Sequence, residues 1–346
     1  MLLLFLLLCS VPWLAVVDAD SSSRGSQEQQ LHTLHCNKTL EIILITLDLT
    51  FVDEDDEAAV RERFCSVFQL VHEHQLKGDK TYEQAINKFT HMQWEDIKSS
   101  RTGYRIQADR VEIPNATFEA SPDYETPATV DWRTQGIVTP VEDQGPCASC
   151  WAFAAADALA SQRSIQNATT TLRALSVQQL LDCSTEQGNA GCTDGRMTNA
   201  FAYAITAGIV SESDYPYEKK EGADCRLNKD NILVKPRGFG QVQLNDEEAL
   251  KQAVAQIGPI AAAVTVRETF SRYKSGIYED KDCGEFSPNH GVLIVGYGTE
   301  NGKDYWLIKN SWGDDWGEDG YVRMSRNDGN MCKIASAAVY PLLADQ

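Results

Sequence analysis

The stretch Gln144-Gly145-Pro146-Cys147-Ala148-Ser149-Cys150-Trp151 lies directly before an Ala-rich run that continues to Ser164. Because Ser149–Ser164 holds no Gly or Pro, it predicts a helix. A helix that begins here places Cys150 in its first turn, where unpaired backbone N–H groups and the helix dipole favour a thiolate over a thiol. Cys150 is therefore a candidate nucleophile.

A nucleophilic thiol also needs a basic partner, and the C-terminal two-thirds of the chain offers one. Five of the six histidines precede residue 100, so only His290 remains, at the head of the β-rich run Val292–Tyr297. An isolated histidine is more often structural than catalytic. Its coincidence with a cysteine at a helix start favours catalysis.

The motif Lys309-Asn310-Ser311-Trp312-Gly313 supplies a third candidate. The amide of Asn310 can accept a hydrogen bond from one imidazole nitrogen, so that the other nitrogen faces the sulfur. Trp312 and Trp316 can shield that bond from water. In isolation the motif would indicate a Gly/Asp turn with core tryptophans.

The N-terminus predicts secretion. Residues 1–19 read as a signal peptide, because the apolar runs end at Asp18 and a small residue follows at Ala19, although a basic residue at the start is missing. Pro12 interrupts the apolar residues, which fall short of the ~20 that a spanning helix needs. The second apolar stretch, Leu40–Val52, carries Glu41 and Asp48 and predicts a buried helix or strand. Glycosylation triplets occur at Asn37, Asn115 and Asn167.

Charge and cysteine content limit the function further. The net charge of −19, from 31 basic and 50 acidic residues, argues against a nucleic-acid partner. Of ten cysteines, Cys9 lies in the signal segment, Cys36 and Cys65 lie in the N-terminal third, and seven lie beyond residue 140. Seven is odd, so three disulfides and one free thiol are the simplest arrangement, and a free thiol in a secreted protein asks for a chemical reason.

The sequence changes character along its length. The spacing of apolar residues predicts a helix over Glu57–Leu76, whereas Ser99–Pro127 predicts an extended, exposed connector that a protease can cut. Beyond it, helices are predicted first and strands afterwards. The further helices are Ser176–Asp182 and Asp246–Gln256 (N-capped by Asn245 or Asp246), and the strands are Ile260–Val266, Val292–Tyr297, Tyr305–Lys309 and Tyr321–Met324.

Together the three motifs resemble the papain family of cysteine proteases, in particular its cathepsin L-like branch. The resemblance covers Thr126–Gln346 and begins with Val130-Asp131-Trp132-Arg133. It implies an α+β, papain-like two-domain fold, with a helical domain over about 135–237 and a β-barrel-like domain over about 238–340. A signal peptide (1–19) and a mainly helical inhibitory propeptide (20–125) would precede the mature protease (126–346).

The resemblance also implies roles for the candidate residues. Cys150 corresponds to the nucleophile, His290 to the general acid/base and Asn310 to the residue that orients it. Gln144 and the N–H of Cys150 correspond to the oxyanion hole. The chain would then be a secreted or lysosomal endopeptidase made as a zymogen, without a cofactor. A His-rich insertion of the kind found in exopeptidase relatives is absent between Cys183 and Cys225.

Disulfide pairing and the propeptide are likewise expected from the family. The implied pairs are Cys147–Cys192, Cys183–Cys225 and Cys283–Cys332, which leave Cys150 free. A zinc site would need a second close cysteine pair, and a thioredoxin-like motif would leave Gln144 and His290 unexplained. Asn87-Lys88-Phe89 resembles a propeptide motif, with Ala85 and His91 in place of its usual Gly and Asp. Residues 36–56 match nothing familiar, and indicate either a divergent propeptide or a gene-model error.

Several residues near the expected substrate site depart from the family pattern. Ala148 replaces a glycine, and Asp194 and Arg196 flank the expected backbone-pairing residue, Gly195. Correspondence places Met197, Pro288 and Ala337 (with Ala263 or a neighbour) around the S2 pocket, which predicts an apolar P2 residue. Arg196, at the rim, suggests an additional attraction for acidic side chains.

Two other functions were weighed against an active protease. A catalytically impaired papain-fold binding or inhibitor protein is disfavoured by the presence of all four catalytic positions, and a disulfide-rich structural module does not explain the odd thiol. The expected partners are peptide or protein substrates, the chain's own propeptide and cystatin-like inhibitors, with no membrane after signal cleavage. The expected state is a monomer in the lysosome, the endosome or the extracellular space.

Overall fold

The computed structural model describes residues 35–46, 50–106, 114–166, 171–222 and 224–343. The chain divides into two compact units, Met1–Phe68 and Gln69–Gln346, each of which is described by itself. The predicted signal peptide lies outside the described residues.

The N-terminal unit contains two helical segments joined by a disulfide. Residues 35–46 are helical, and α3 spans Glu54–Gln75, which confirms the helix predicted there. Cys36 and Cys65 form a disulfide that the sequence analysis did not assign. In the stretch predicted to be buried, Leu40 and Ile43 are buried but Val52 is exposed. None of the described helices is long and apolar enough to cross a membrane.

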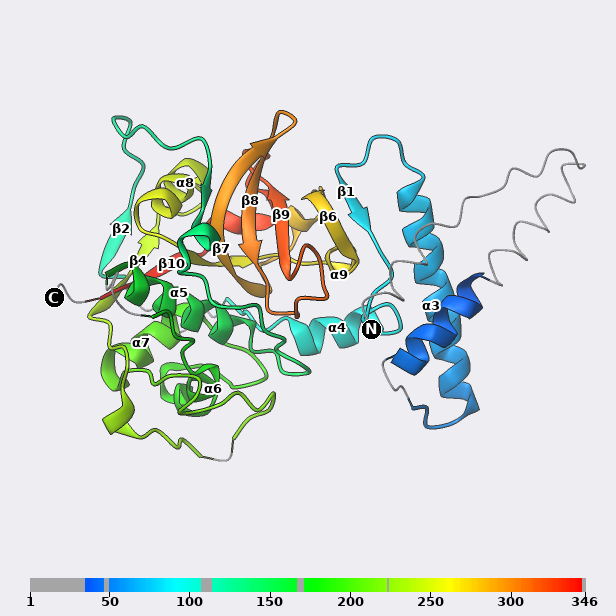
Figure 1. Ribbon diagram of the computed structural model, residues 1–346, viewed down its shortest axis with the longest axis horizontal. Helices are drawn as coiled ribbons and strands as arrows, with labels where there is room; N and C mark the ends of the chain where they lie inside the picture. The colour runs from blue at the N-terminus through cyan, green and yellow to red at the C-terminus, as the bar shows by residue number, and fades with distance from the viewer. Residues whose placement is uncertain (1–34, 47–49, 107–113, 167–170, 223, 344–346) are drawn as a thin grey trace, which may run out of the picture. The chain divides into compact units, whose positions relative to one another are not determined.

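The second unit combines helices and a large sheet (Figure 1). Its α-helices are α4 (Trp94–Arg101), α5 (Cys150–Gln166), α6 (Val177–Cys183), α7 (Met197–Ala207), α8 (Glu247–Gln256) and α9 (Glu268–Ser271). Its strands are β1 (Tyr82–Gln84), β2 (Ala116–Phe118), β3 (Val130–Asp131), β4 (Gly238–Val242), β5 (Ile260–Val264), β6 (Tyr273–Tyr278), β7 (His290–Glu300), β8 (Lys303–Lys309), β9 (Tyr321–Ser325) and β10 (Ala338–Leu342).

Local sequence explains the helices that were predicted. The Ala-rich segment forms α5, whose small side chains let it pack closely against β5, β7 and β10. Helix α6 is N-capped by Ser176, whose hydroxyl accepts a hydrogen bond from Gln179 N, and α8 is N-capped in the same way by Asp246. Helices α4 and α7 were not predicted.

The strands follow the order β1-β6-β9-β8-β7-β5-β10-β4-β2, with β3 paired to β7. All four predicted strands are present, as β5, β7, β8 and β9. The path has two different ends, β1 and β2, so the described strands form an open sheet and not the closed barrel that the term barrel-like suggests. Antiparallel pairing places His290 opposite Val264 and Lys309 opposite Leu293, which brings the start of β7 and the end of β8 to the same region.

Two hydrophobic cores form on either side of this sheet. One gathers α5, α6 and α7 against residues such as Leu293 and Val295, and contains Trp151 and Phe201. The other contains Trp306 and the aromatic side chains around Trp312. Alternate residues of β7 enter different cores, as the period of a strand buried on both faces requires.

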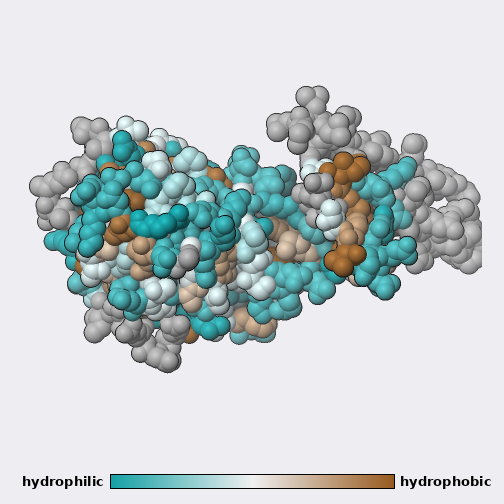
Figure 2. Space-filling model, turned by 90° about the horizontal axis from the view of Figure 1, so that it is seen from below, coloured by the Kyte–Doolittle hydropathy of each residue, from teal (hydrophilic) through white to brown (hydrophobic). Residues whose placement is uncertain are grey.

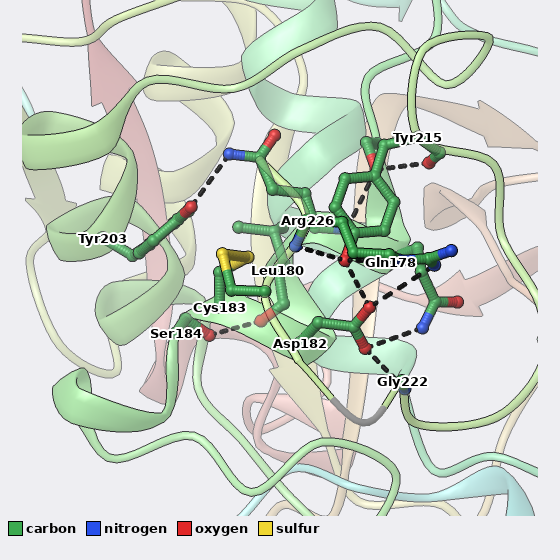
Figure 3. Close-up of a disulfide and its surroundings, with 12 residues drawn as sticks. Gln178, Leu180, Asp182, Cys183, Ser184, Tyr203, Tyr215, Gly222 and Arg226 are labelled. Carbon is green, nitrogen blue, oxygen red and sulfur yellow. Dashed lines mark hydrogen bonds and ion pairs between the residues drawn. A yellow bond between two sulfur atoms is a disulfide. The ribbon is translucent and has the colours of Figure 1, made fainter. Parts of the chain in front are cut away.

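The three expected disulfides are present, namely Cys147–Cys192, Cys183–Cys225 and Cys283–Cys332, and Cys150 is the free cysteine of the described chain. Figure 3 shows the surroundings of Cys183, where buried Asp182 accepts hydrogen bonds from Tyr215 Oη and Gly222 N. These bonds tie the loop that carries Cys225 to the end of α6.

The reading of Ser99–Pro127 as an exposed connector is wrong at its beginning. Ser99 and Ser100 belong to α4, and Thr102 and Tyr104 are each 8% exposed. Further along, β2 pairs in parallel with β4. The proline and acidic residues predicted an extended segment. An extended segment can still be buried when another part of the fold pairs with it.

The surface agrees with the acidic composition. The face in Figure 2 is largely hydrophilic, and its hydrophobic residues form a few separate groups. Lys and Arg side chains of the described residues are mostly held in ion pairs with the more numerous carboxylates, as in Arg323 with Glu300 and Glu318.

The Cys36–Cys65 disulfide should stabilise the N-terminal helical segments. The bond closes a loop with a sequence separation of 29, for which loop entropy predicts about 3.6 kcal/mol. Replacing both cysteines by alanine should therefore accelerate amide hydrogen exchange over residues 35–46 by up to about 400-fold in the full-length chain. Exchange in α5 serves as the internal control, and unchanged protection of residues 35–46 would contradict the prediction.

Candidate active site

The site is built at the start of α5. Cys150 is the first residue of this helix and is fully buried. Its sulfur accepts backbone N–H groups from Gly103 at 3.2 Å and Gly291 at 3.3 Å. The N–H groups of Cys150 and Trp151 also favour negative charge on the sulfur. Cys150 therefore lies in the helix-start environment that the sequence predicted.

His290 and Asn310 are brought together by the pairing of β7 with its two neighbours. His290 Nε2 lies 2.8 Å from Asn310 Oδ1, and both residues are buried. Because an amide oxygen only accepts, this bond puts the proton of neutral His290 on Nε2. The other ring nitrogen, Nδ1, is buried and has no hydrogen-bond partner among the described residues.

Tryptophans cover the histidine as predicted, but unequally. The ring of Trp312 lies 5.0 Å from that of His290, and Trp312 is fully buried. Trp316 packs on Trp312 at 5.4 Å and on Phe270 at 5.0 Å. Trp312 therefore shields the His290–Asn310 bond directly, whereas Trp316 supports Trp312.

Gln144 is held at the same site by four hydrogen bonds, one of which its backbone oxygen accepts from Tyr217 Oη at 2.6 Å. Its backbone N–H donates to Ser311 O, its Oε1 accepts from Ser311 Oγ at 2.7 Å, and its Nε2 donates to Cys147 O at 2.7 Å. The amide has two N–H groups, so this arrangement leaves one for a developing oxyanion.

A segment from the N-terminal part of the second unit covers Cys150. Gly103 O accepts from Gly195 N at 2.8 Å, and Tyr104 N donates to Asn289 O at 3.0 Å. A β-carbon on Gly103 would lie 1.7 Å from Ala148 O. Only glycine can lie so close to the backbone beside Cys150, and the sequence analysis did not identify this residue.

The motif at residues 87–89 anchors the covering segment. Asn87 Nδ2 donates to Ser271 O at 2.7 Å. The ring of Phe89 meets that of Trp312 edge to face at 5.3 Å, and Phe89 is 2% exposed. The motif that resembles part of an inhibitory propeptide therefore contacts Trp312, which packs against His290.

An ion-pair cluster ties the segment to the loop before Cys150. Asp143 accepts from Lys88 Nζ at 2.9 Å and from Arg101, and Lys88 also pairs with Asp315 at 2.7 Å. Although burial opposes it, the Gly145 N–H and the charges of Arg101 and Lys88 lower the pKa of Asp143 to about 2. Single charged residues that are far apart in the sequence do not indicate which of them will pair. The sequence therefore did not predict this ion-pair cluster.

Burial beneath the covering segment favours the neutral forms of Cys150 and His290. Burial raises the pKa of the Cys150 thiol to about 11, against the opposing effect of the backbone N–H groups. Burial lowers the pKa of His290 to about 4, although Asn310 and the backbone of Arg101 oppose this shift. Between these values neither group is charged, so the closed site does not contain the thiolate expected from the helix start.

Only some of the expected substrate-binding residues lie around one cavity. Arg196, Met197 and Ala337 line one cavity together with Tyr104. Gly195 pairs with the covering segment, while Pro288 is buried but does not line the cavity.

Among the glycosylation candidates, Asn37 and Asn115 are exposed, and Asn167 lies outside the described residues. The described residues contain no group of acidic, His or Cys side chains that could hold a metal ion.

Comparisons with known proteins agree with this geometry. Residues 126–342 match the model of the papain family of cysteine proteases. The chain is 46% identical to digestive cysteine proteinase 3 of Homarus americanus, over 79% of this chain and 84% of the relative, and 42% identical to cathepsin L of Sarcophaga peregrina, over 77% and 80%.

Solved zymogen structures are similar to this chain over more residues than the family model matches. Digestive procathepsin L2 from the larval midgut of Tenebrio molitor has a TM-score of 0.84 and 36% identity, and covers 89% of this chain and all of its own. Residues 126–342 alone cannot supply that coverage, so the similarity includes a large part of the region before the protease domain. In procathepsins this region is the propeptide, bound to the protease domain. The chain belongs to the papain family of cysteine proteases and is a cathepsin L-like zymogen.

Proposed function

We propose that the chain is the zymogen of a secreted or lysosomal endopeptidase that hydrolyses peptide bonds through a thioester on Cys150. The observation that carries this proposal is the combination of a free thiol at a helix start with the His290–Asn310 bond. Relatives described as digestive enzymes fit a route through the secretory pathway. We further propose 1–19 as signal peptide, 20–125 as propeptide and 126–346 as mature enzyme.

The proposed chemistry uses the residues in fixed roles. Cys150 Sγ attacks the carbonyl carbon of the peptide, and the resulting oxyanion is stabilised by the side chain of Gln144 and the N–H of Cys150. The C–N bond then breaks as His290 delivers a proton to the leaving amine. Water attacks the thioester while His290 accepts its proton, which releases the acid product and restores the thiol.

Asn310 and Trp312 act through the histidine. The bond to Asn310 Oδ1 keeps the imidazole in one orientation, with Nδ1 available to exchange protons. Trp312 excludes water from this bond. Opening of the Thr102–Tyr104 segment removes the burial that keeps Cys150 and His290 neutral, so a thiolate–imidazolium pair becomes accessible only in the opened enzyme.

Substitution of the catalytic residues should separate their roles. With the zymogen activated by the same added protease, Cys150→Ala should lower kcat by at least about 10⁴-fold, because it removes the nucleophile. Gln144→Ala and Asn310→Ala should each lower kcat by about 10²-fold, because they remove an oxyanion donor and an orienting group. Hydrolysis of a fluorogenic peptide measures all three.

The matched control is Gln243→Ala, an exposed amide away from the site, which should retain wild-type kcat. If the wild-type chain neither cleaves the peptide nor reacts with a thiol-directed epoxide at Cys150, the catalytically impaired binding protein is the better account.

Acidification should open the covering segment through His290. The pKa of about 4 in the closed form lies below the ordinary value of 6.5, so the closed form binds fewer protons between these pH values. Opening is therefore favoured as pH falls, by up to about tenfold per pH unit from 6.5 to 4. Asp143 acts in the same direction only at lower pH, because its pKa falls from the ordinary 3.8 to about 2 in the closed form, so the two forms differ in its protonation only below about pH 4.

Hydrogen exchange at Gly103 and Gly195, corrected for the intrinsic pH dependence, measures the opening in a Cys150→Ser zymogen that cannot process itself. His290→Gln in the same background removes the titrating group and should flatten the profile. An unchanged profile in that variant would assign the acid sensitivity to another residue.

A further inference from the structure

The hydroxyl of Tyr217 joins the two parts of the proposed oxyanion hole. Tyr217 Oη donates a hydrogen bond to Gln144 O at 2.6 Å, and Ser149 Oγ lies 2.7 Å from the same phenol oxygen. Ser149 directly precedes Cys150, so its carbonyl and the N–H of Cys150 belong to one planar peptide group. One phenol therefore bonds both to the residue that carries the side-chain donor and to the residue before the backbone donor.

The carbonyl of Gln144 sets the direction of these hydrogen bonds. Because a carbonyl oxygen only accepts, the single proton of Tyr217 Oη is used in the bond to Gln144 O. The phenol oxygen then accepts from Ser149 Oγ, whose alternative acceptor, Cys147 O, is farther away at 3.3 Å. Burial raises the pKa of Tyr217, which keeps the phenol protonated and able to donate. A chain of hydrogen bonds thus runs from Ser149 through Tyr217 to Gln144.

The carbonyl of Gln144 depends on this phenol. Gln144 is fully buried, and Tyr217 Oη is the donor that its backbone oxygen has among the described residues. Without the hydroxyl, a buried carbonyl would be left unsatisfied, and the backbone would gain by shifting toward another donor. Since the side chain of Gln144 is attached to this backbone, such a shift would also move Nε2.

The ring of Tyr217 is itself held close to Cys150. The backbone N–H of Tyr217 donates to Glu212 Oε1 at 2.6 Å, and the ring meets that of Phe153 edge to face at 4.9 Å. Phe153 is 4% exposed and lies three residues after Cys150 in α5. The helix that carries the thiol therefore also carries a contact that fixes the phenol.

We propose that Tyr217 is a positioning residue whose hydroxyl sets the spacing between the side chain of Gln144 and the N–H of Cys150. This inference rests on the proposed endopeptidase function and adds to its oxyanion hole a residue that lies outside the three sequence motifs. Donors that are fixed in advance stabilise the charge of the transition state without reorganisation. Loss of the hydroxyl should therefore weaken transition-state stabilisation more than substrate binding.

Tyr217→Phe removes the hydroxyl and keeps the ring. In the activated enzyme it should lower kcat for a fluorogenic peptide by about tenfold and change KM by less than about twofold. Titration of Cys150 with a thiol-directed epoxide gives the concentration of active enzyme, so that misfolded protein does not enter kcat. Tyr203→Phe is the matched control and should keep the wild-type kcat, because Tyr203 is a buried tyrosine of α7 whose hydroxyl accepts from Gln179 Nε2 at 2.9 Å.

Alkylation by iodoacetamide separates positioning of the oxyanion hole from a general loss of structure. The thiolate attacks this reagent at a saturated carbon, and no oxyanion forms. Alkylation of Cys150 in the activated Tyr217→Phe enzyme should therefore keep the wild-type rate while peptide hydrolysis falls.

A double-mutant cycle shows whether Tyr217 acts through Gln144. When Gln144→Ala has already removed the side-chain donor, Tyr217→Phe should lower kcat by less than about threefold, since only the N–H of Cys150 is left to position. A residue with a merely structural role would lower kcat by the same factor in both backgrounds.

The outcomes separate this inference from the proposed function. An unchanged kcat in Tyr217→Phe, equal losses of hydrolysis and alkylation, or a full tenfold loss in the Gln144→Ala background would overturn the inference while leaving the endopeptidase intact. If the wild-type enzyme does not cleave the peptide, both the inference and the proposed function fail.

Discussion

The backbone N–H of Gly103 lies 3.2 Å from Cys150 Sγ, and much of the closed form depends on this contact. It requires the chain to pass so close to Ala148 O that no β-carbon fits on Gly103. Such an approach excludes solvent from the sulfur and, with Trp312, from the imidazole. Burial thereby favours the neutral forms of Cys150 and His290. For the catalytic pair that we propose, inhibition would therefore be electrostatic as well as steric.

The remaining contacts of the segment hold this approach in place and change little between pH 6.5 and 4. Phe89 packs on Trp312, β1 extends the sheet at β6, and Lys88 and Arg101 share the strongly acidic Asp143. These groups fix position, whereas His290 is the group whose protonation the closed form opposes. In the function that we propose, His290 would thereby serve catalysis in the open enzyme and acid sensing in the closed one.

The sequence predicted the features that short-range patterns encode. The Ala-rich run predicted α5, Asp246 was one of two residues predicted to cap α8, and the β-rich runs predicted the strands that carry His290 and lead to Asn310. Family resemblance supplied the three disulfide pairs of the protease domain. Each of these depends on neighbouring residues or on motifs of several residues.

The features that were missed depend on distant partners. Nothing in Thr102-Gly103-Tyr104 marks it as buried until Gly195 and Asn289 are placed beside it. The Asp143 cluster joins three residues that are far apart in sequence, and whether a sheet closes depends on pairing between its end strands. Arg196 was expected at the rim of a substrate pocket, and the fold places it with Tyr104 around one cavity.

We expect the close passage of Gly103 to control the reactivity of Cys150. The rate at which iodoacetamide alkylates Cys150 at pH 7 in the full-length zymogen measures this control in wild type, Gly103→Ala and Gly78→Ala. Gly78 has open space where a β-carbon would lie, so it is the matched glycine control. Alkylation should be at least about tenfold faster for Gly103→Ala, because about 1.4 kcal/mol of lost closure gives that factor, and Gly78→Ala should keep the wild-type rate. Equal rates in all three proteins would show that the passage of Gly103 does not control the thiol.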